Sequence, residues 1–139
     1  MKLIELFSGT GSVGEAFQEI KYDVVSVDIS DKFEHTCVAD VLIFDYTVFP
    51  SGHFDVVWAS CPCTEYSCAK TIDIRDFVGA DRLVEGALEI INYLKPKYWW
   101  LENPATSLLH MRPCMQYIGK PYRLDYCQYG APYKNGHTH

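Results

Sequence analysis

The sequence contains no hydrophobic run long enough to cross a membrane. Its longest apolar stretches, such as 54–59 and 98–101, fall far short of the roughly 18 residues that a membrane-spanning helix needs. The first residues also lack the pattern of a secretory signal, in which a long apolar stretch and a small-residue cleavage site follow a basic segment. We therefore expect a cytoplasmic protein with no membrane partner.

Basic residues are scarce: 12 lysines and arginines stand against 18 acidic residues, for a net charge of −6. Proteins that bind nucleic acids normally neutralise phosphates with basic residues. The deficit lies in the first half, because residues 1–60 carry three basic and ten acidic groups, whereas residues 61–139 carry nine and eight. Any nucleic-acid surface is expected in the second half, which contains Lys70, Arg75, Arg112, Lys120, Arg123 and Lys134.

Paired Cys-x2-Cys knuckles are missing, although the chain has six cysteines. Without an export signal, reduced thiols are the expectation. The spacing of Cys61, Cys63 and Cys68 leaves a zinc site with Cys37 or His35 as a minor alternative, and we expect no metal. The five histidines show no ligand spacing and are expected at the surface.

Low-complexity segments and internal repeats are also absent, and 139 residues suffice for one hydrophobic core but not for two. Apolar periodicity predicts strands at 2–7, 22–27, 54–59, 98–101 and 122–127, and a short third strand that ends near 38–40. It predicts helices at 13–20 and 74–94 and a short helix through residue 108. Alternation of strands and helices indicates an α/β fold with a doubly wound, mostly parallel sheet. Trp58, Trp99 and Trp100 are expected as core and interface residues.

A glycine cluster, Gly9-x-Gly11-x-x-Gly14, follows the first predicted strand, and the acidic Asp28 ends the second. This is the pattern of a dinucleotide-binding turn, in which glycines let the backbone approach a ligand and a carboxylate binds ribose hydroxyls. The same arrangement suits any adenosine cofactor. The alternative is a glycine-rich turn that only connects the strand to the helix.

Two further polar clusters follow the fourth and fifth predicted strands. Residues 59–67 read Ala-Ser-Cys-Pro-Cys-Thr-Glu-Tyr-Ser, and residues 102–104 read Glu-Asn-Pro. Ligands of doubly wound sheets bind at the carboxyl ends of the strands, so the chemistry is expected where these clusters lie.

Taken together, these segments resemble the cytosine-5 DNA methyltransferases. That family has a Phe-x-Gly-x-Gly turn, matched here by 7–11, then a Pro-Cys loop with a serine four residues after the cysteine, and then Glu-Asn. Residues 126–132 look like its Tyr-Gly-x-Pro segment, so the resemblance covers 2–133. It implies a single catalytic-type methyltransferase domain over 1–139, with the Rossmann-like fold that binds S-adenosylmethionine.

By this resemblance, Cys63 is the nucleophile that adds to carbon 6 of cytosine and activates carbon 5. Glu102 supports the attack by donating a proton or hydrogen bond near N3, for which a raised pKa is expected. Ser67 and Asn103 orient the catalytic loop and its glutamate. The methyl group comes from the sulfonium of the cofactor, and the target base is flipped out of the duplex.

The resemblance also implies a cofactor pocket. Asp28 binds the ribose hydroxyls, Ile29 packs on the adenine, Asp40 accepts from the adenine amino group with Val41 beside it, and Pro62 separates cofactor from base. The methionine and ribose are lined by Phe7, Ser8, Gly9 and Gly11.

The sequence departs from the family pattern after residue 132. The Gln-x-Arg-x-Arg segment, target-recognition domain and final helix of the family are not seen, while Cys61 and Thr64 replace a common proline and glutamine. Three hypotheses follow. The first is a minimal or split methyltransferase acting on DNA, or on RNA in its place, as a homo-oligomer or with a separate recognition subunit. The second is a catalytically inactive, cofactor-binding regulatory remnant, and the third is an NAD-dependent oxidoreductase.

Overall fold

The computed structural model of the chain describes residues 1–125 and 137–138. Its main sheet consists of β1 (Lys2–Leu6), β2 (Asp23–Asp28), β3 (Cys37–Val38), β4 (Val56–Ser60) and β5 (Tyr98–Glu102). The helices in this part of the chain are α1 (Ser12–Glu19), α2 (Phe77–Leu94) and the short 3-10 helices η1 (Tyr46–Val48), η2 (Leu108–Met111) and η3 (Pro113–Met115). A separate antiparallel pair is formed by β6 (Leu124–Asp125) and β7 (His137–Thr138).

The main sheet is parallel throughout, with the strand order β3-β2-β1-β4-β5. The chain therefore proceeds from β1 towards one edge and then returns to build the other edge from β4. The order reverses between β1 and β4, and in such sheets the ligand crevice lies outside the carboxyl ends of the strands at this reversal. The predicted α/β fold with a doubly wound parallel sheet is confirmed, and the site should lie beyond the ends of β1 and β4.

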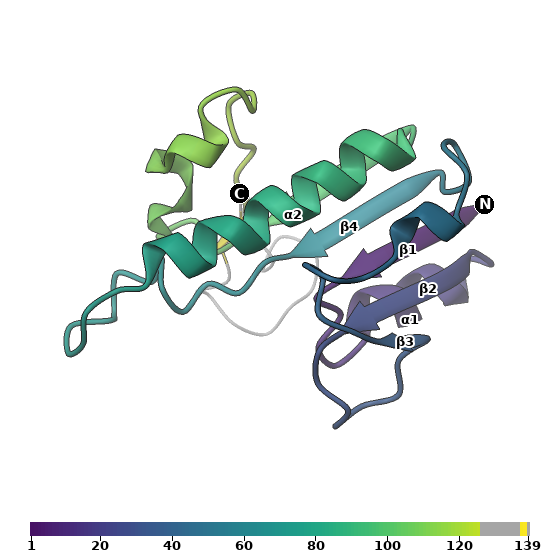
Figure 1. Cartoon of the computed structure of the whole chain (residues 1–139), viewed down its shortest axis with the longest axis horizontal. Coiled ribbons are helices and arrows are strands. Elements are labelled where there is room, and N and C mark those ends of the chain that lie inside the picture. The colour runs from purple at the N-terminus through teal and green to yellow at the C-terminus, as the bar shows by residue number, and fades with distance from the viewer. Residues whose placement is uncertain (126–136, 139) are drawn as a thin grey trace.

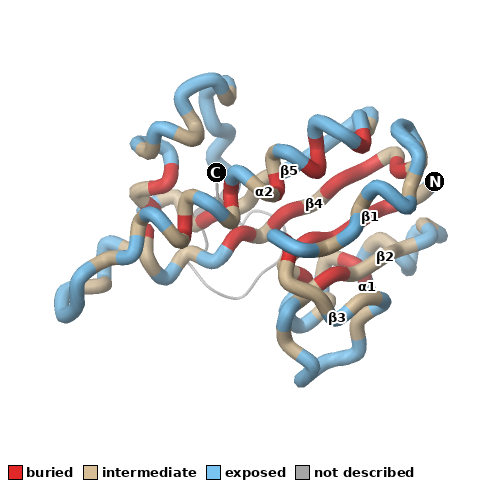
Figure 2. Tube along the Cα trace, in the orientation of Figure 1, coloured by how far each residue is buried: buried red, intermediate tan, exposed pale blue. Residues whose placement is uncertain are grey.

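The two α-helices cover opposite faces of the sheet (Figure 1). On one face, Ile4 and Val57 lie in the buried core together with Val84 and Ile90 of α2. Glu5 points to the other face, because side chains alternate along a strand, and there it meets the α1 helix. Figure 2 shows that buried residues are concentrated in β1, β4 and the inner side of α2. The core between α2 and the sheet thus holds β1 and β4 in place.

The α2 helix starts later than the sequence predicted, at Phe77 instead of residue 74. The Asp76 carboxylate accepts a hydrogen bond from the Gly79 N–H at 2.8 Å and caps the helix there. At the other end Lys95 adopts a left-handed conformation, with φ 47°, and Pro96 follows. A local side-chain cap, which apolar periodicity does not register, therefore sets the first residue.

The shortest elements differ most from the prediction. The third strand is only Cys37–Val38 and ends where the sequence predicted, near residues 38–40, whereas η1 and η3 were not predicted. Of the predicted last strand, β6 contains Leu124–Asp125, while residues 126 and 127 lie outside the described part of the chain.

The tryptophans were predicted to be core and interface residues, and none of the three is fully buried in the chain. Trp99 and Trp100 are 40% and 42% exposed, and Trp58 is half-buried. They lie on β4 and β5, and β5 is an edge strand of the main sheet among the described residues, which leaves its side chains less covered. No helix in residues 1–125 is both long enough and apolar enough to pass through a membrane.

Candidate active site

The glycine turn after β1 is held in left-handed backbone conformations. Phe7, Gly9 and Gly11 have φ values of 58°, 52° and 78°, and the Gly11 N–H donates to the Ser8 carbonyl at 2.7 Å. Left-handed conformations cost a non-glycine residue roughly 1–2 kcal/mol, so Phe7 is strained in a way that Gly9 and Gly11 are not. A Cβ added at either glycine would have no atom within 4 Å. The turn therefore presents open backbone to a ligand, as a cofactor turn requires.

Asp28 connects this turn to the end of β2. Its carboxylate accepts from the Gly9 N–H at 2.9 Å and from the Ser30 N–H at 2.8 Å. Ile29 is 70% exposed directly beside it. A carboxylate oxygen has two lone pairs, so Asp28 retains acceptor capacity for hydroxyl groups. The structure thus brings Asp28 to the glycine turn, with an uncovered apolar side chain beside it.

The buried Ser8 forms a contact that the sequence did not predict. Its Oγ lies 2.9 Å from Nδ1 of His35, and the buried Nε2 of His35 has no hydrogen-bond partner among the described residues. The prediction of a surface position was wrong for His35 and also for His53, since both are half-buried. A buried polar atom without a partner is costly and uncommon in folded proteins. A lone histidine in a loop gives no sequence signal for this.

Glu5 is a buried carboxyl beneath the same turn, with 2% of its surface exposed. Its Oε2 accepts from the Gly14 N–H at 3.0 Å, and a Cβ on Gly14 would lie 2.7 Å from that oxygen. Burial raises the pKa of Glu5 to about 7, with Asp28 and Glu15 adding to the increase and the Gly14 hydrogen bond opposing it. The third glycine of the cluster therefore makes room for a buried acid under α1.

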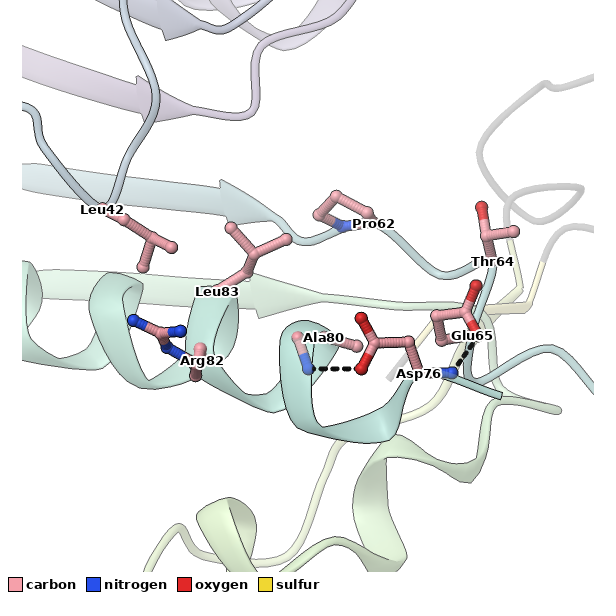
Figure 3. Close-up of a pocket in the computed structure, with 9 residues that line it drawn as sticks. Leu42, Pro62, Thr64, Glu65, Asp76, Ala80, Arg82 and Leu83 are labelled. Atoms are coloured by element: carbon pink, nitrogen blue, oxygen red, sulfur yellow. Dashed lines mark hydrogen bonds between the residues drawn. The ribbon is translucent and has the colours of Figure 1, made fainter. Parts of the chain in front are cut away.

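A cavity of about 330 Å³ lies between the loop after β3, the loop after β4 and the start of α2 (Figure 3). Leu42, Pro62 and Leu83 form its apolar part, and its other lining residues are Thr64, Glu65, Asp76, Gly79, Ala80 and Arg82. Asp40 accepts from the Leu42 N–H at 2.9 Å, while the side chain of Val41 is buried in the core. Leu42 therefore faces the cavity together with Pro62, while the neighbouring Val41 packs in the core.

The two cysteines of the loop after β4 differ in exposure. Cys61 is buried, and burial raises its pKa to about 12, whereas Cys63 is half-buried and follows the exposed Pro62. The Tyr66 N–H donates to the Cys63 carbonyl at 3.0 Å, and Ser67 Oγ accepts from the Ala69 N–H at 3.2 Å. Of the two thiols, only that of Cys63 is open to a substrate.

A buried tyrosine anchors this loop to the rest of the molecule. The Tyr66 hydroxyl donates to Asp81 of α2 at 2.9 Å, and its carbonyl accepts from the Leu108 N–H at 2.9 Å. Arg112 binds both oxygens of Asp81 at 2.7–3.1 Å and lies 4.2 Å from the centre of the Phe77 ring. Because these contacts join distant segments, sequence periodicity could not reveal them.

Glu102 ends β5 beside the end of β4, in register with Ser60. Burial raises the pKa of Glu102, and a hydrogen bond from Ser60 opposes that increase. The next residue, Asn103, is buried and donates from Nδ2 to the Cys61 carbonyl at 2.8 Å. The Asn103 hydrogen bond therefore links the segment that carries Glu102 to the Pro-Cys loop, at the carboxyl ends of β4 and β5.

Several basic residues of the second half are engaged within the chain. Lys70 pairs with Glu65 at 2.7 Å, and Arg75 donates to the carbonyls of Glu65 and Lys70 at 2.7 and 2.8 Å. Arg112 pairs with Asp81 at 2.7 Å. Three of the six cations predicted for a nucleic-acid surface thus stabilise the loop around Cys63.

The fold matches a solved structure, described as a SAM dependent methyltransferase from Archaeoglobus fulgidus, with a TM-score of 0.52 and 18% identity. The match covers 92% of this chain and 57% of that one. The architecture is thus the Rossmann-like fold of the S-adenosylmethionine-dependent methyltransferases. Within that class, residues 1–114 match the family model of C-5 cytosine-specific DNA methylases.

The chain is also 37% identical, over 145 residues, to a probable DNA (cytosine-5)-methyltransferase of Frog virus 3 (isolate Goorha). This match covers 93% of the chain and 64% of the relative, so the chain spans less than two thirds of that protein's length. The chain belongs to the C-5 cytosine-specific DNA methylase family. The Tyr-Gly-x-Pro segment predicted at 126–132 lies outside the described residues.

Proposed function

We propose that this chain is the catalytic part of a cytosine-5 DNA methyltransferase, which transfers a methyl group from S-adenosylmethionine to carbon 5 of cytosine. The observation that carries the proposal is the junction of β4 and β5: Glu102 is in register with Ser60, and Asn103 binds the Cys61 carbonyl. This junction adjoins the crevice between β1 and β4, where the glycine turn lies.

The residues of this chain would divide the chemistry between them. The Cys63 thiolate attacks carbon 6, and the electrons of the 5,6 double bond move towards carbon 5. Glu102, whose pKa is raised by burial, donates a proton or hydrogen bond near N3 and stabilises the charge that enters the ring. Carbon 5 then accepts the methyl group and loses its proton to a base, after which the thiolate leaves.

The cofactor site is proposed on the other side of the crevice. The fit rests on the open backbone at Gly9 and Gly11 and on the acceptor capacity of Asp28, with Ile29 exposed beside it. Phe7 and Ser8 belong to the same turn. Leu42 and Pro62 line the cavity, and Asp40 accepts a hydrogen bond from the Leu42 N–H. The bound cofactor supplies an electrophilic methyl group; these residues orient it and exclude water.

Target recognition is proposed to come from elsewhere: a further part of the protein, a second copy or a separate subunit. The chain has a net charge of −6, and three of its candidate DNA-binding cations are engaged internally. Such a surface provides little attraction for phosphates by itself. The expected substrate is DNA, and the expected location is the cytoplasm. RNA is the alternative substrate, and methylation assays on both nucleic acids would distinguish the two.

A covalent trap tests the catalytic assignment. DNA containing 5-fluorocytosine should form a stable adduct with the wild-type chain in the presence of S-adenosylmethionine, because fluorine cannot leave carbon 5 as a proton does. Cys63→Ser should abolish the adduct. Cys68→Ser is the matched control, because this exposed cysteine lies on the same loop and bonds only the Thr106 carbonyl among the described residues.

Calorimetric titration separates the alternative hypotheses. The proposal expects S-adenosylmethionine and its demethylated product to bind and NAD not to bind. Binding of the cofactor without any adduct on DNA or RNA would favour the regulatory remnant. Binding of NAD alone would instead favour the oxidoreductase.

A further inference from the structure

Trp58 and Ser60 share a face of the sheet with Glu102. They are two residues apart on β4, so their side chains point to the same side. On β5 the residues in register with them are Trp100 and Glu102. A strip of four side chains therefore runs along two paired strands and ends at the proposed acid.

The hydrogen bond between Trp58 and Ser60 has a fixed direction. The indole Nε1 lies 2.9 Å from Ser60 Oγ, and an indole nitrogen can only donate. Ser60 Oγ must accept, so its own proton remains free to donate to another group. The Glu102 carboxyl, in register with Ser60, is the acceptor that the strand pairing supplies.

The position of the indole is fixed from the neighbouring strand. Its ring stacks on Trp100, with centroids 5.8 Å apart and an angle of 24° between the planes. Trp100 lies two residues before Glu102 on β5, so the same strand positions both the ring that stacks on Trp58 and the carboxyl of Glu102. Rotation of the Trp58 side chain would disrupt both the stacking and the hydrogen bond.

We propose that Trp58 and Ser60 are a positioning pair for Glu102: the indole N–H orients the Ser60 hydroxyl so that its proton points at the carboxyl. The importance of this pair for turnover rests on the proposed function, whereas its effect on Glu102 does not. The nearby Cys61 thiol remains neutral because burial raises its pKa to about 12, and Glu5, the other buried carboxyl of this face, lies on β1. The Ser60 hydroxyl is therefore the polar contact that acts on Glu102 from β4.

The pair sets the balance between the two protonation states of Glu102. A hydroxyl that donates to a carboxylate stabilises the charged form, so it counteracts burial and keeps the pKa lower than burial alone would. Removing it should raise the pKa of Glu102. A proton donor with a higher pKa stays protonated to higher pH, so the alkaline limb of the activity profile should move upwards.

Carbon-13 NMR titration of the glutamate carboxyls tests the pair without any need for turnover, with Glu102→Gln to assign the signal. Ser60→Ala should raise the pKa of Glu102 by about one unit, the size expected for loss of a hydrogen bond to a charged group. Trp58→Phe keeps an aromatic ring for stacking but removes the N–H that orients the Ser60 hydroxyl. The pKa of Glu102 should therefore rise by about half as much as in Ser60→Ala. Ser60→Thr should restore the wild-type value.

Ser26→Ala is the matched control. Ser26 lies on β2, and its hydroxyl forms hydrogen bonds with Thr36 and not with a residue of β4 or β5. It should leave the Glu102 titration unchanged. If Ser60→Ala also leaves it unchanged while the chain remains folded by circular dichroism, the positioning pair is refuted. If Trp58→Phe has no effect, the indole has no part in it.

Methylation assays across pH provide the second readout. In Ser60→Ala the alkaline limb of kcat should shift upwards by the same amount as the NMR value, with the KM for DNA unchanged. An NMR shift without methylation by any variant would keep the positioning pair and overturn the proposed function. Methylation without an NMR shift in Ser60→Ala would support the proposed function and refute the positioning pair.

Discussion

The two sides of the crevice are built in different ways. On the glycine-turn side (residues 7–30), backbone N–H groups of Gly9 and Ser30 bind Asp28, and the backbone adopts left-handed conformations. On the thiol side (residues 60–67 and 102–103), side chains such as Asn103 and Tyr66 anchor the loop. The difference indicates that the first side depends on backbone freedom and the second on particular side chains.

The largest expected effect is on the thiol side. Asn103→Ala removes the hydrogen bond to the Cys61 carbonyl and frees the loop that carries Cys63. A misplacement of about 1 Å at a reacting centre can cost about 100-fold in rate, so methylation should fall by about that factor. Affinity for S-adenosylmethionine, measured by calorimetry, should stay the same.

Asn92→Ala, an exposed asparagine on α2, is the control for this change and should keep full activity. A parallel loss of cofactor affinity in Asn103→Ala would show that the two sides are coupled and would contradict the comparison.

A smaller effect is expected from the buried acid on the glycine-turn side. The pKa of Glu5 is raised to about 7 in the folded chain, so the folded state keeps its proton over a pH range in which the unfolded state has lost it. The free energy of unfolding should therefore fall by about 2 kcal/mol as the pH rises from about 4.5 to about 7. Glu5→Gln should abolish this fall, measured by chemical denaturation.

Glu19→Gln changes an exposed carboxyl at the end of α1, which does not contribute to the raised pKa of Glu5, and should retain the pH dependence of the wild type. An unchanged pH profile in Glu5→Gln would mean that the pKa of Glu5 is not raised in the folded chain.

The smallest expected effect tests backbone freedom directly. Gly11→Ala meets no neighbouring atom, but its φ of 78° is unfavourable for alanine. The free energy of unfolding should fall by about 1 kcal/mol, and cofactor affinity should weaken roughly fivefold, with turnover at saturating cofactor retained. Gly119→Ala, where space is also open but no left-handed conformation is required, should change neither quantity.

Sequence patterns predicted the long elements within a few residues, because buried parallel strands and an amphipathic helix carry continuous apolar signals. The strands at 2–6, 23–28, 56–60 and 98–102 all correspond to predicted segments. The start of α2 was missed because Asp76 caps it, and η1 and η3 are too short to show periodicity.

The predicted site residues are in part brought together, and their roles remain predictions. Asp28 meets the glycine turn, and Asn103 meets the Pro-Cys loop, because both follow the carboxyl ends of strands. His35, and the link from Tyr66 through Asp81 to Arg112, could not be predicted. Each is a contact between distant segments that depends on the folded chain and carries no local pattern.

The central position of β1 affects how the sheet assembles during synthesis. β2 follows β1 closely, but the other neighbour of β1 starts only at Val56, so one edge of the central strand is completed much later. Until then its unpaired N–H and C=O groups lie beside apolar side chains, a state that favours association with other chains. Early pairing with β2, supported by α1, would leave only one edge exposed while the remaining strands are made.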